Sequence, residues 1–112
     1  MALWKEVTTL DEWEALRRRS HEKPVLLLKH STRCPVSSNA LREFEDYAEQ
    51  HPDKHEYALV KVIESRPVSN RIAEDLGIVH ASPQIFLLKD GNAYWNTSHW
   101  SITTEHISAV AD

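Results

Sequence analysis

The stretch KHSTRCPVSSNAL, residues 29–41, contains the only cysteine of the chain, Cys34. This cysteine lies between an apolar, strand-like run and a helix-like pattern that begins at Pro35, a residue type favoured at the first helical position. A thiol at this N-cap point faces unpaired backbone N–H groups, here those of Val36 and Ser37, and the positive end of the helix dipole. Both stabilise a thiolate, so we expect a reactive cysteine with a pKa below the free value of about 8.5.

Other uses of a lone cysteine fit the spacing less well. A free cysteine is often a small buried hydrophobe, but the strand–Cys–Pro–helix setting favours a reactive one. A phosphate-binding C-x5-R loop needs arginine where Ala40 stands, and a peroxiredoxin-like P-x-x-x-T-x-x-C site needs proline where Leu27 stands. A Cys–His protease is a poor fit, because the chain is small and shows no evident scaffold for an oxyanion hole. Thiol exchange is therefore the favoured chemistry.

Metal chemistry has little support, because the seven histidines lie in neither a C-x-x-C nor an H-E-x-x-H pattern. His51 and His55 have helical spacing, but Pro52 and Asp53 between them indicate a solvated turn. We therefore expect no metal site.

The bulk composition excludes several classes of protein. The chain of 112 residues, with 41% hydrophobic and 27% charged residues, fits one globular domain over residues 1–112. A formal charge of −4 argues against nucleic-acid binding. There is no run near the roughly 20 apolar residues of a membrane span, and the early charges exclude a secretory signal. One cysteine cannot form an internal disulfide, so we expect a cytoplasmic protein.

The hydrophobic pattern predicts strands that alternate with helices. A capping box of Thr9 and Glu12 opens a first helix whose Leu10, Trp13 and Leu16 are expected to face the core. The expected helices span about residues 10–20, 35–50, 69–77 and 103–111, and the expected strands span 25–28, 56–64 and a hairpin over 84–96 that turns at Asp90–Gly91. This order favours an α/β three-layer sandwich around a small mixed sheet.

Two segments resemble thioredoxin-fold proteins. Residues 34–37, Cys-Pro-Val-Ser, resemble the C-x-x-C motif with its second cysteine replaced by serine, and residues 80–91, HASPQIFLLKDG, look like the segment that holds a cis-proline before a hairpin. The resemblance implies that Pro83 is cis and packs beside Cys34. It also implies that the backbone of Ser82 aligns the bound substrate.

More narrowly, STRCPVSSNAL, SNRIAEDLGIVHASPQ and SHWSIT together resemble the monothiol bacilliredoxins over about residues 5–110. That family implies a thioredoxin-like mixed four-stranded sheet with an extra N-terminal helix and room for a short extra strand. It implies a cytoplasmic monomer of the stress response that removes bacillithiol from mixed disulfides on client proteins. Cys34 would be the nucleophile, with Pro35 and Ser37 completing the catalytic motif.

The resemblance also implies the partners and the binding residues. Bacillithiol is then a co-substrate rather than a cofactor, and the partners are bacillithiolated client proteins, a low-molecular-weight thiol and an external reductant. Because bacillithiol carries carboxylates, Lys29 and Arg33 are expected on a cationic rim, beside the N–H of Val36. His99 is a candidate acid or base and Trp100 a candidate apolar wall, with a surface histidine and a core tryptophan as equal alternatives.

Leu28 departs from dithiol thioredoxins, which carry a buried acid six residues before the cysteine. With Ser37 in place of the resolving thiol, such an acid would have nothing to deprotonate and would cost desolvation energy. Two alternatives stay open. A monothiol-glutaredoxin-like iron–sulfur carrier has Cys-Gly-Phe-Ser, which Pro35 and Val36 break, and a non-catalytic thioredoxin-like binding module would not need the thiol.

Overall fold

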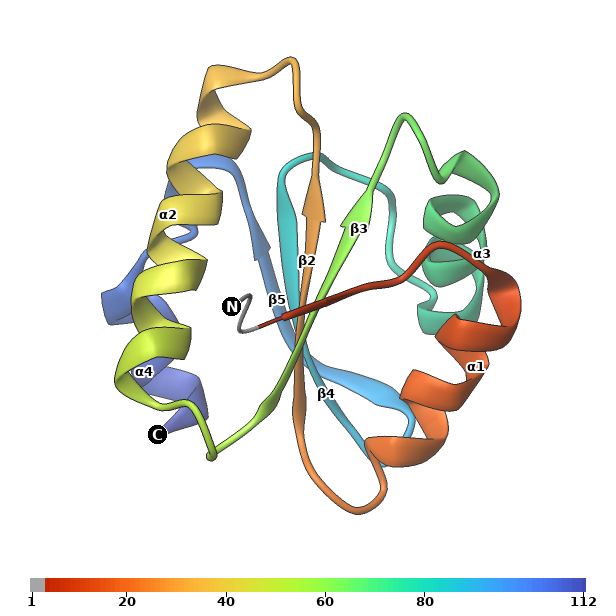
Figure 1. The fold of residues 1–112 in the computed structure, drawn as a ribbon, viewed down its shortest axis with the longest axis horizontal. Helices are drawn as coiled ribbons and strands as arrows, with labels where there is room; N and C mark the ends of the chain where they lie inside the picture. The colour runs from red at the N-terminus through yellow and green to blue at the C-terminus, as the bar shows by residue number, and fades with distance from the viewer. Residues whose placement is uncertain (1–3) are drawn as a thin grey trace.

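The computed structural model describes residues 4–112, which form one mixed sheet with helices on both faces (Figure 1). In chain order the elements are β1 (Lys5–Glu6), α1 (Leu10–Arg19), β2 (Val25–His30), α2 (Pro35–Gln50), β3 (Glu56–Lys61), α3 (Arg66–Leu76), β4 (Gln84–Lys89), β5 (Asn92–Ser98), the 3-10 helix η1 (His99–Ser101) and α4 (Thr104–Ala111). This is the predicted three-layer α/β sandwich. None of these helices is both long and apolar enough to cross a membrane.

The sheet has five strands in the order β1-β3-β2-β4-β5. Strands β1, β3 and β2 are parallel, whereas β4 runs antiparallel to β2 and β5 antiparallel to β4. The fifth strand is β1, which has two residues and pairs with β3. It is the short extra strand that the family resemblance allowed for. The carboxyl ends of β2 and β3 therefore meet at one edge of the sheet, and the loop that carries Cys34 leaves from this edge.

Local sequence signals explain where several elements begin and end. Thr9 caps α1, and its side chain and that of Glu12 form both bonds of the predicted capping box. Gly77 ends α3 in the left-handed conformation, with φ of 66°. The turn between β4 and β5 needs positive φ at two residues, which Asp90 and Gly91 adopt at 53° and 79°. These three predictions are confirmed.

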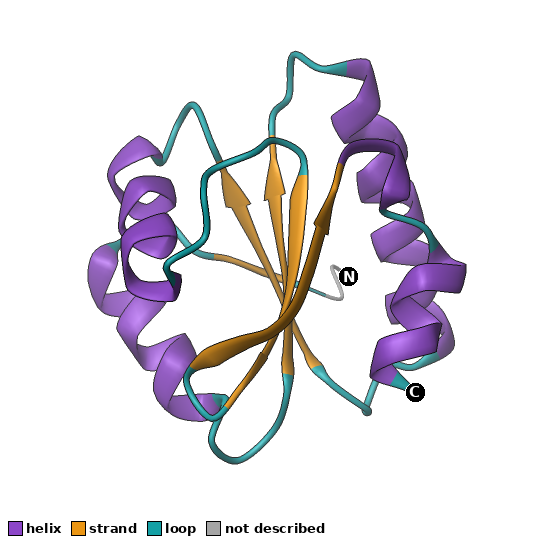
Figure 2. Cartoon of the chain, turned by 180° about the vertical axis from the view of Figure 1, so that it is seen from behind, coloured by secondary structure: helices purple, strands orange, loops and turns teal. Residues whose placement is uncertain are grey.

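Helices α2 and α4 cover one face of the sheet, and α1 and α3 cover the other (Figure 2). Along β2 the side chains alternate between the two layers, because successive residues of a strand point to opposite faces. Leu26 and Leu28 pack on the α2 side, and Val25 and Leu27 on the α1 side. The continuous apolar run thus belongs to a central strand that is buried on both faces.

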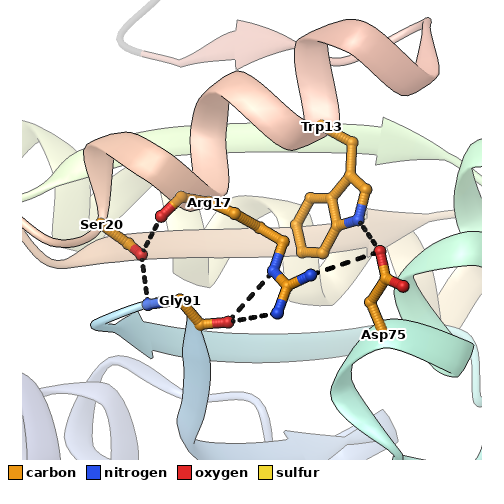
Figure 3. Close-up of polar contacts among 5 residues, drawn as sticks. All are labelled: Trp13, Arg17, Ser20, Asp75 and Gly91. Carbon is orange, nitrogen blue, oxygen red and sulfur yellow. Dashed lines mark hydrogen bonds and ion pairs between the residues drawn. The ribbon is translucent and has the colours of Figure 1, made fainter.

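Helix α1 is fixed to the rest of the molecule by a polar cluster (Figure 3). Trp13 is fully buried, and its Nε1–H donates to Oδ2 of Asp75 in α3 at 2.8 Å. Arg17 donates from Nε and Nη2 to the carbonyl of Gly91, at 3.1 and 2.9 Å, and its Nη1 lies 3.5 Å from Asp75. The hydroxyl of Ser20 accepts from the N–H of Gly91 at 2.8 Å. One helix is therefore joined to both α3 and the β4–β5 turn.

Three expectations about the elements are wrong in detail. Leu10 is 38% exposed, whereas Val7, two residues before the cap, is buried in the core with Trp13 and Leu16. Strand β3 ends at Lys61 rather than 64, where a turn closes through Ser65 N–H to the Lys61 carbonyl at 2.8 Å. Helix α3 begins at Arg66 rather than 69, since a proline is tolerated in the first helical turn.

Candidate active site

Cys34 is the N-cap of α2 and follows the end of β2 by a short loop. Its backbone is extended, with φ of −116° and ψ of 123°, and Pro35 opens the helix as expected. The Cys34 N–H donates to the Ser31 carbonyl at 3.3 Å, and the Cys34 carbonyl accepts from Ser38 N–H at 3.2 Å. The thiol is free and half-buried. Backbone bonds on both sides therefore hold a partly accessible sulfur at the start of a helix of 16 residues.

The helix lowers the pKa of Cys34. The backbone N–H of Ser37 makes the largest contribution, followed by that of Val36, while burial opposes them and the Ser37 hydroxyl adds to the lowering. The sulfur makes no cap hydrogen bond of ordinary geometry, so the N–H groups act mainly as nearby positive dipoles. Arg33 is exposed beside the cysteine, but the lowering comes from the helix rather than from its guanidinium.

Ser37 occupies the place of a second thiol and is fully buried. Its Oγ accepts a hydrogen bond from the backbone N–H of Ser31 at 3.3 Å. The serine therefore ties the first turn of α2 back to the loop that carries Cys34. A hydroxyl cannot form a disulfide, so the arrangement offers one exchangeable sulfur.

A second loop reaches the same edge of the sheet at the start of β4. The peptide bond between Ser82 and Pro83 is cis, and Pro83 is buried. Gln84 pairs with Lys29 of β2, so this loop ends beside the last residues of the strand that leads to Cys34. Direct packing of Pro83 on the cysteine stays a prediction. The Ser82 hydroxyl is buried without a hydrogen-bond partner in the part of the chain that the structure describes.

The segment Ser98–Trp100 borders this proline loop, whereas its expected place beside Cys34 stays a prediction. The N–H of His99 donates to the Pro83 carbonyl at 3.0 Å, and the His99 backbone has a positive φ of 55°. The His99 ring is exposed, with Nδ1 3.0 Å from Oγ of Ser98. Trp100 is 64% exposed, so the alternative of a core tryptophan is wrong. Both side chains are therefore accessible to solvent, and their contact with substrate stays a prediction.

Lys29 does not lie on the rim, which corrects the sequence-based expectation. It is fully buried, because alternation along β2 points it to the α3 side, where its Nζ donates to the Ser69 carbonyl at 3.0 Å. Its Nζ also lies 3.1 Å from Nδ1 of His80. Sequence reasoning missed the Lys29–His80 pair. The period of two along β2 was the signal that would have placed Lys29 with Leu27, away from solvent.

The histidines are distributed over several segments in the described part of the chain. Among residues 4–112 no group of three or more His, Cys, Asp or Glu side chains is placed to hold an ion. The expected solvated turn is wrong for His55, which is 4% exposed. Its ring lies near Tyr47 and Tyr57, with centroid distances of 6.1 Å to each. The turn folds back on these two aromatic rings, so His55 joins the packed layer.

Comparison with known proteins gives the family. The model of the monothiol bacilliredoxin BrxC family matches residues 5–107. The chain belongs to this monothiol bacilliredoxin family. The bacilliredoxin match includes both Cys34 and the loop that ends at Pro83.

Solved structures agree on the fold of this bacilliredoxin. A protein described as having a thioredoxin fold shares 27% identity, with a TM-score of 0.88, 98% of this chain covered and 95% of that one. Fasciola hepatica thioredoxin shares 18% identity at a TM-score of 0.79, covering 96% and 95%. Mitochondrial thioredoxin 3 from Saccharomyces cerevisiae shares 16% at 0.77, covering 96% and 92%. The fold is thioredoxin-like, and fold and family together support a thiol–disulfide oxidoreductase role.

Proposed function

We propose that this bacilliredoxin removes bacillithiol from mixed disulfides on client proteins, with Cys34 as the nucleophile that takes up the bacillithiol. The observation that carries the proposal is the position of Cys34 at the N-terminus of α2, where helix N–H groups lower its pKa. Thiolate is the attacking form in disulfide exchange, and a lower pKa also makes the sulfur a better leaving group. The buried Ser37 leaves no internal thiol to compete for the intermediate.

The reaction is an exchange of one disulfide for another. The Cys34 thiolate attacks the bacillithiol sulfur of the client mixed disulfide, a new Cys34–bacillithiol disulfide forms, and the client thiolate leaves and takes a proton from solvent or from His99. No net oxidation occurs in this step. A second thiol must then attack the Cys34 adduct, and the disulfide that it forms outside the protein is returned to thiols by an external reductant.

The surroundings of Cys34 suit such a substrate. The backbone of Ser82 and Pro83 would align the client chain beside the thiolate. The exposed guanidinium of Arg33 and the N–H of Val36 would bind the carboxylates of bacillithiol. Exposed Trp100 would cover the apolar part of the client. In this proposal the protein works as a cytoplasmic monomer, with bacillithiol as co-substrate and no cofactor.

Intact mass spectrometry tests the proposal. The reduced protein is mixed with a one-cysteine peptide that carries bacillithiol, in parallel with Cys34→Ser. We expect the wild type to gain one bacillithiol as the peptide loses it, and the variant to do neither. A wild type that leaves the peptide adduct intact would contradict the proposed exchange. The same assay with a glutathione adduct separates a wrong thiol from a wrong chemistry.

The two alternatives predict other results. An iron–sulfur carrier would be coloured after reconstitution and would lose its cluster absorbance in Cys34→Ser. A binding module would retain client binding in the same variant, and its thiol would react like free cysteine. The bacillithiol exchange assay and these two measurements use the same pair of proteins, so one preparation distinguishes the three functions.

A further inference from the structure

Lys29 is a fully buried cation whose partners include no carboxylate in the described part of the chain. Its Nζ donates to the carbonyl of Ser69 at 3.0 Å and lies 3.1 Å from Nδ1 of His80. The same atom lies 5.8 Å from the centroid of the Phe86 ring. One ammonium group on the central strand therefore contacts α3, β4 and the segment before the cis peptide bond.

The stability of the fold does not explain this lysine. Burying an ammonium is costly even when it is paired, and an apolar side chain of similar volume often stabilises a protein more. The residues before it on the same face of β2, Val25 and Leu27, are apolar, and methionine would continue their pattern. The carbonyl of Ser69 lies inside α3 and does not need the lysine as its donor. The contact that only Lys29 supplies is the one to His80.

Two side chains that belong to strands of the sheet bind the segment 79–83. Gln84 accepts from the N–H of Ala81 at 3.3 Å and donates to the carbonyl of Val79 at 3.2 Å. Lys29 holds the residue between them, His80. Three consecutive residues are thus fixed immediately before the Ser82–Pro83 bond.

We propose that Lys29 is a positioning residue that acts through His80 to hold the substrate-aligning loop, residues 79–83, in its binding geometry. This inference rests on the proposed function, because it takes that loop as the one that aligns the client. Lys29 touches neither substrate nor Cys34. Its effect is to fix backbone groups two and three residues further along the chain, and misplacement of such groups weakens binding of the substrate.

The contact between Lys29 and His80, called the latch below, depends on the protonation of His80. Nδ1 accepts from the ammonium only in neutral imidazole, which then carries its proton on Nε2. Burial lowers the pKa of His80, and the charges of Lys29 and Arg66 lower it further. Burial also lowers the pKa of Lys29 to about 8, which leaves it mostly charged at neutral pH. Once His80 is protonated, both partners are donors and repel, so acid releases the loop.

Lys29→Met is the first test, with Lys89→Met on β4 of the same sheet as the matched control. We expect Lys29→Met to keep or raise the urea midpoint and to leave alkylation of Cys34 by iodoacetamide unchanged, since that small reagent does not need the loop. The KM for the bacillithiolated peptide should rise roughly tenfold, with a smaller change in kcat. The control should change neither constant. A folded Lys29→Met with the wild-type KM would overturn the proposal.

The pH dependence gives a second readout. The wild-type KM should rise as pH falls through the titration of His80. His80→Gln, whose amide oxygen accepts from Lys29 at any pH, should lose this rise, and Lys29→Met should show the high KM throughout. An unchanged pH profile in His80→Gln would contradict the acid-released latch. If Lys29→Met does not fold, His80→Ala removes the same contact by changing its exposed partner. This variant should raise the KM by a similar factor.

Nuclear magnetic resonance separates this inference from the proposed function. In the wild type the ring of His80 should be the Nε2–H tautomer, and the amide of Ala81 should be protected from hydrogen exchange. Lys29→Met should raise the pKa of His80 and reduce the protection of Ala81, whatever substrate the enzyme takes. If these shifts occur but no bacillithiol is transferred, the function is wrong and the latch stands. If exchange proceeds and both signals are unchanged, the latch is wrong.

Discussion

The hydroxyl of Ser37 accepts a hydrogen bond from the backbone N–H of Ser31, and the same residue supplies the N–H that contributes most to the lowered pKa of Cys34. The residue that stands where a dithiol enzyme has its second sulfur therefore has two tasks. Its side chain fixes the loop, and its backbone stabilises the thiolate. This division makes the contribution of the hydroxyl measurable by itself.

Ser37→Ala should destabilise the protein and raise the pKa of Cys34 slightly. The variant leaves the Ser31 N–H without its acceptor in a partly buried place, which costs about 1 kcal/mol of unfolding free energy. The pKa should stay below that of a free thiol, because the helix N–H groups remain. Urea unfolding and the pH dependence of iodoacetamide alkylation measure the two effects. Ser38→Ala, at the exposed neighbouring position, is the control and should change neither. A Cys34 pKa equal to that of free cysteine in Ser37→Ala would mean that the hydroxyl is the main cause.

The sequence was sufficient to place Cys34, because the signals that decide it are local. An apolar run, a cysteine and a proline define a strand end and a helix start within a few residues, and the N–H groups that lower the thiol pKa belong to that same turn. The hairpin at Asp90–Gly91 is local in the same sense, since the turn residues themselves set the backbone. Such features need no knowledge of the rest of the fold.

The features that the sequence did not place depend on distant segments. Alternation along β2 assigns Lys29 to the face of Leu27, but its partners, the Ser69 carbonyl and His80, come from segments far along the chain. His55 follows a proline turn and would be solvated, except that Tyr47 and Tyr57 lie over it. Strand β1 has only two residues, too few for any periodic pattern, and exists because β3 offers a free edge.

Asp75→Ala should lower stability without affecting exchange. The variant leaves the buried Nε1–H of Trp13 without its acceptor and removes one partner of Arg17 (Figure 3). We expect a loss of about 1–3 kcal/mol in the free energy of unfolding. Exchange activity below the transition should equal that of the wild type, because the bonds of this cluster join α1, α3 and the β4–β5 turn and include neither Lys29 nor His80. Arg18→Gln, on an exposed position of the same helix, is the control for a simple change of charge. Lower exchange by folded Asp75→Ala would show that α3 communicates with the site.

Stability should fall as pH falls below about 6.5, the usual pKa of histidine. Burial lowers the pKa of His30, His55 and His80 in the native state, so the unfolded chain takes up protons first and is favoured by acid. The stabilisation is complete above the unfolded pKa and is lost as pH falls through the native values. His55→Phe should keep the aromatic packing and flatten part of this dependence. Urea unfolding at pH 7.5, 6.5 and 5.5 measures the free energy of unfolding at each pH. If this free energy falls with pH equally in the wild type and His55→Phe, the role of His55 is contradicted.

Arg33→Ala should separate activation of the thiol from binding of the substrate. The lowered pKa of Cys34 comes from the N–H groups of Ser37 and Val36, so the variant should keep the wild-type pH dependence of alkylation. Loss of the guanidinium should raise the KM for the bacillithiolated peptide by roughly fivefold, since an exposed cation contributes about 1 kcal/mol to an ion pair. The effect should shrink at high salt, where exposed charges are screened. Arg42→Ala, at an exposed position on α2, is the control. If Arg33→Ala instead raised the pKa of Cys34 and left the KM unchanged, the guanidinium would serve the thiolate and not the carboxylates of bacillithiol.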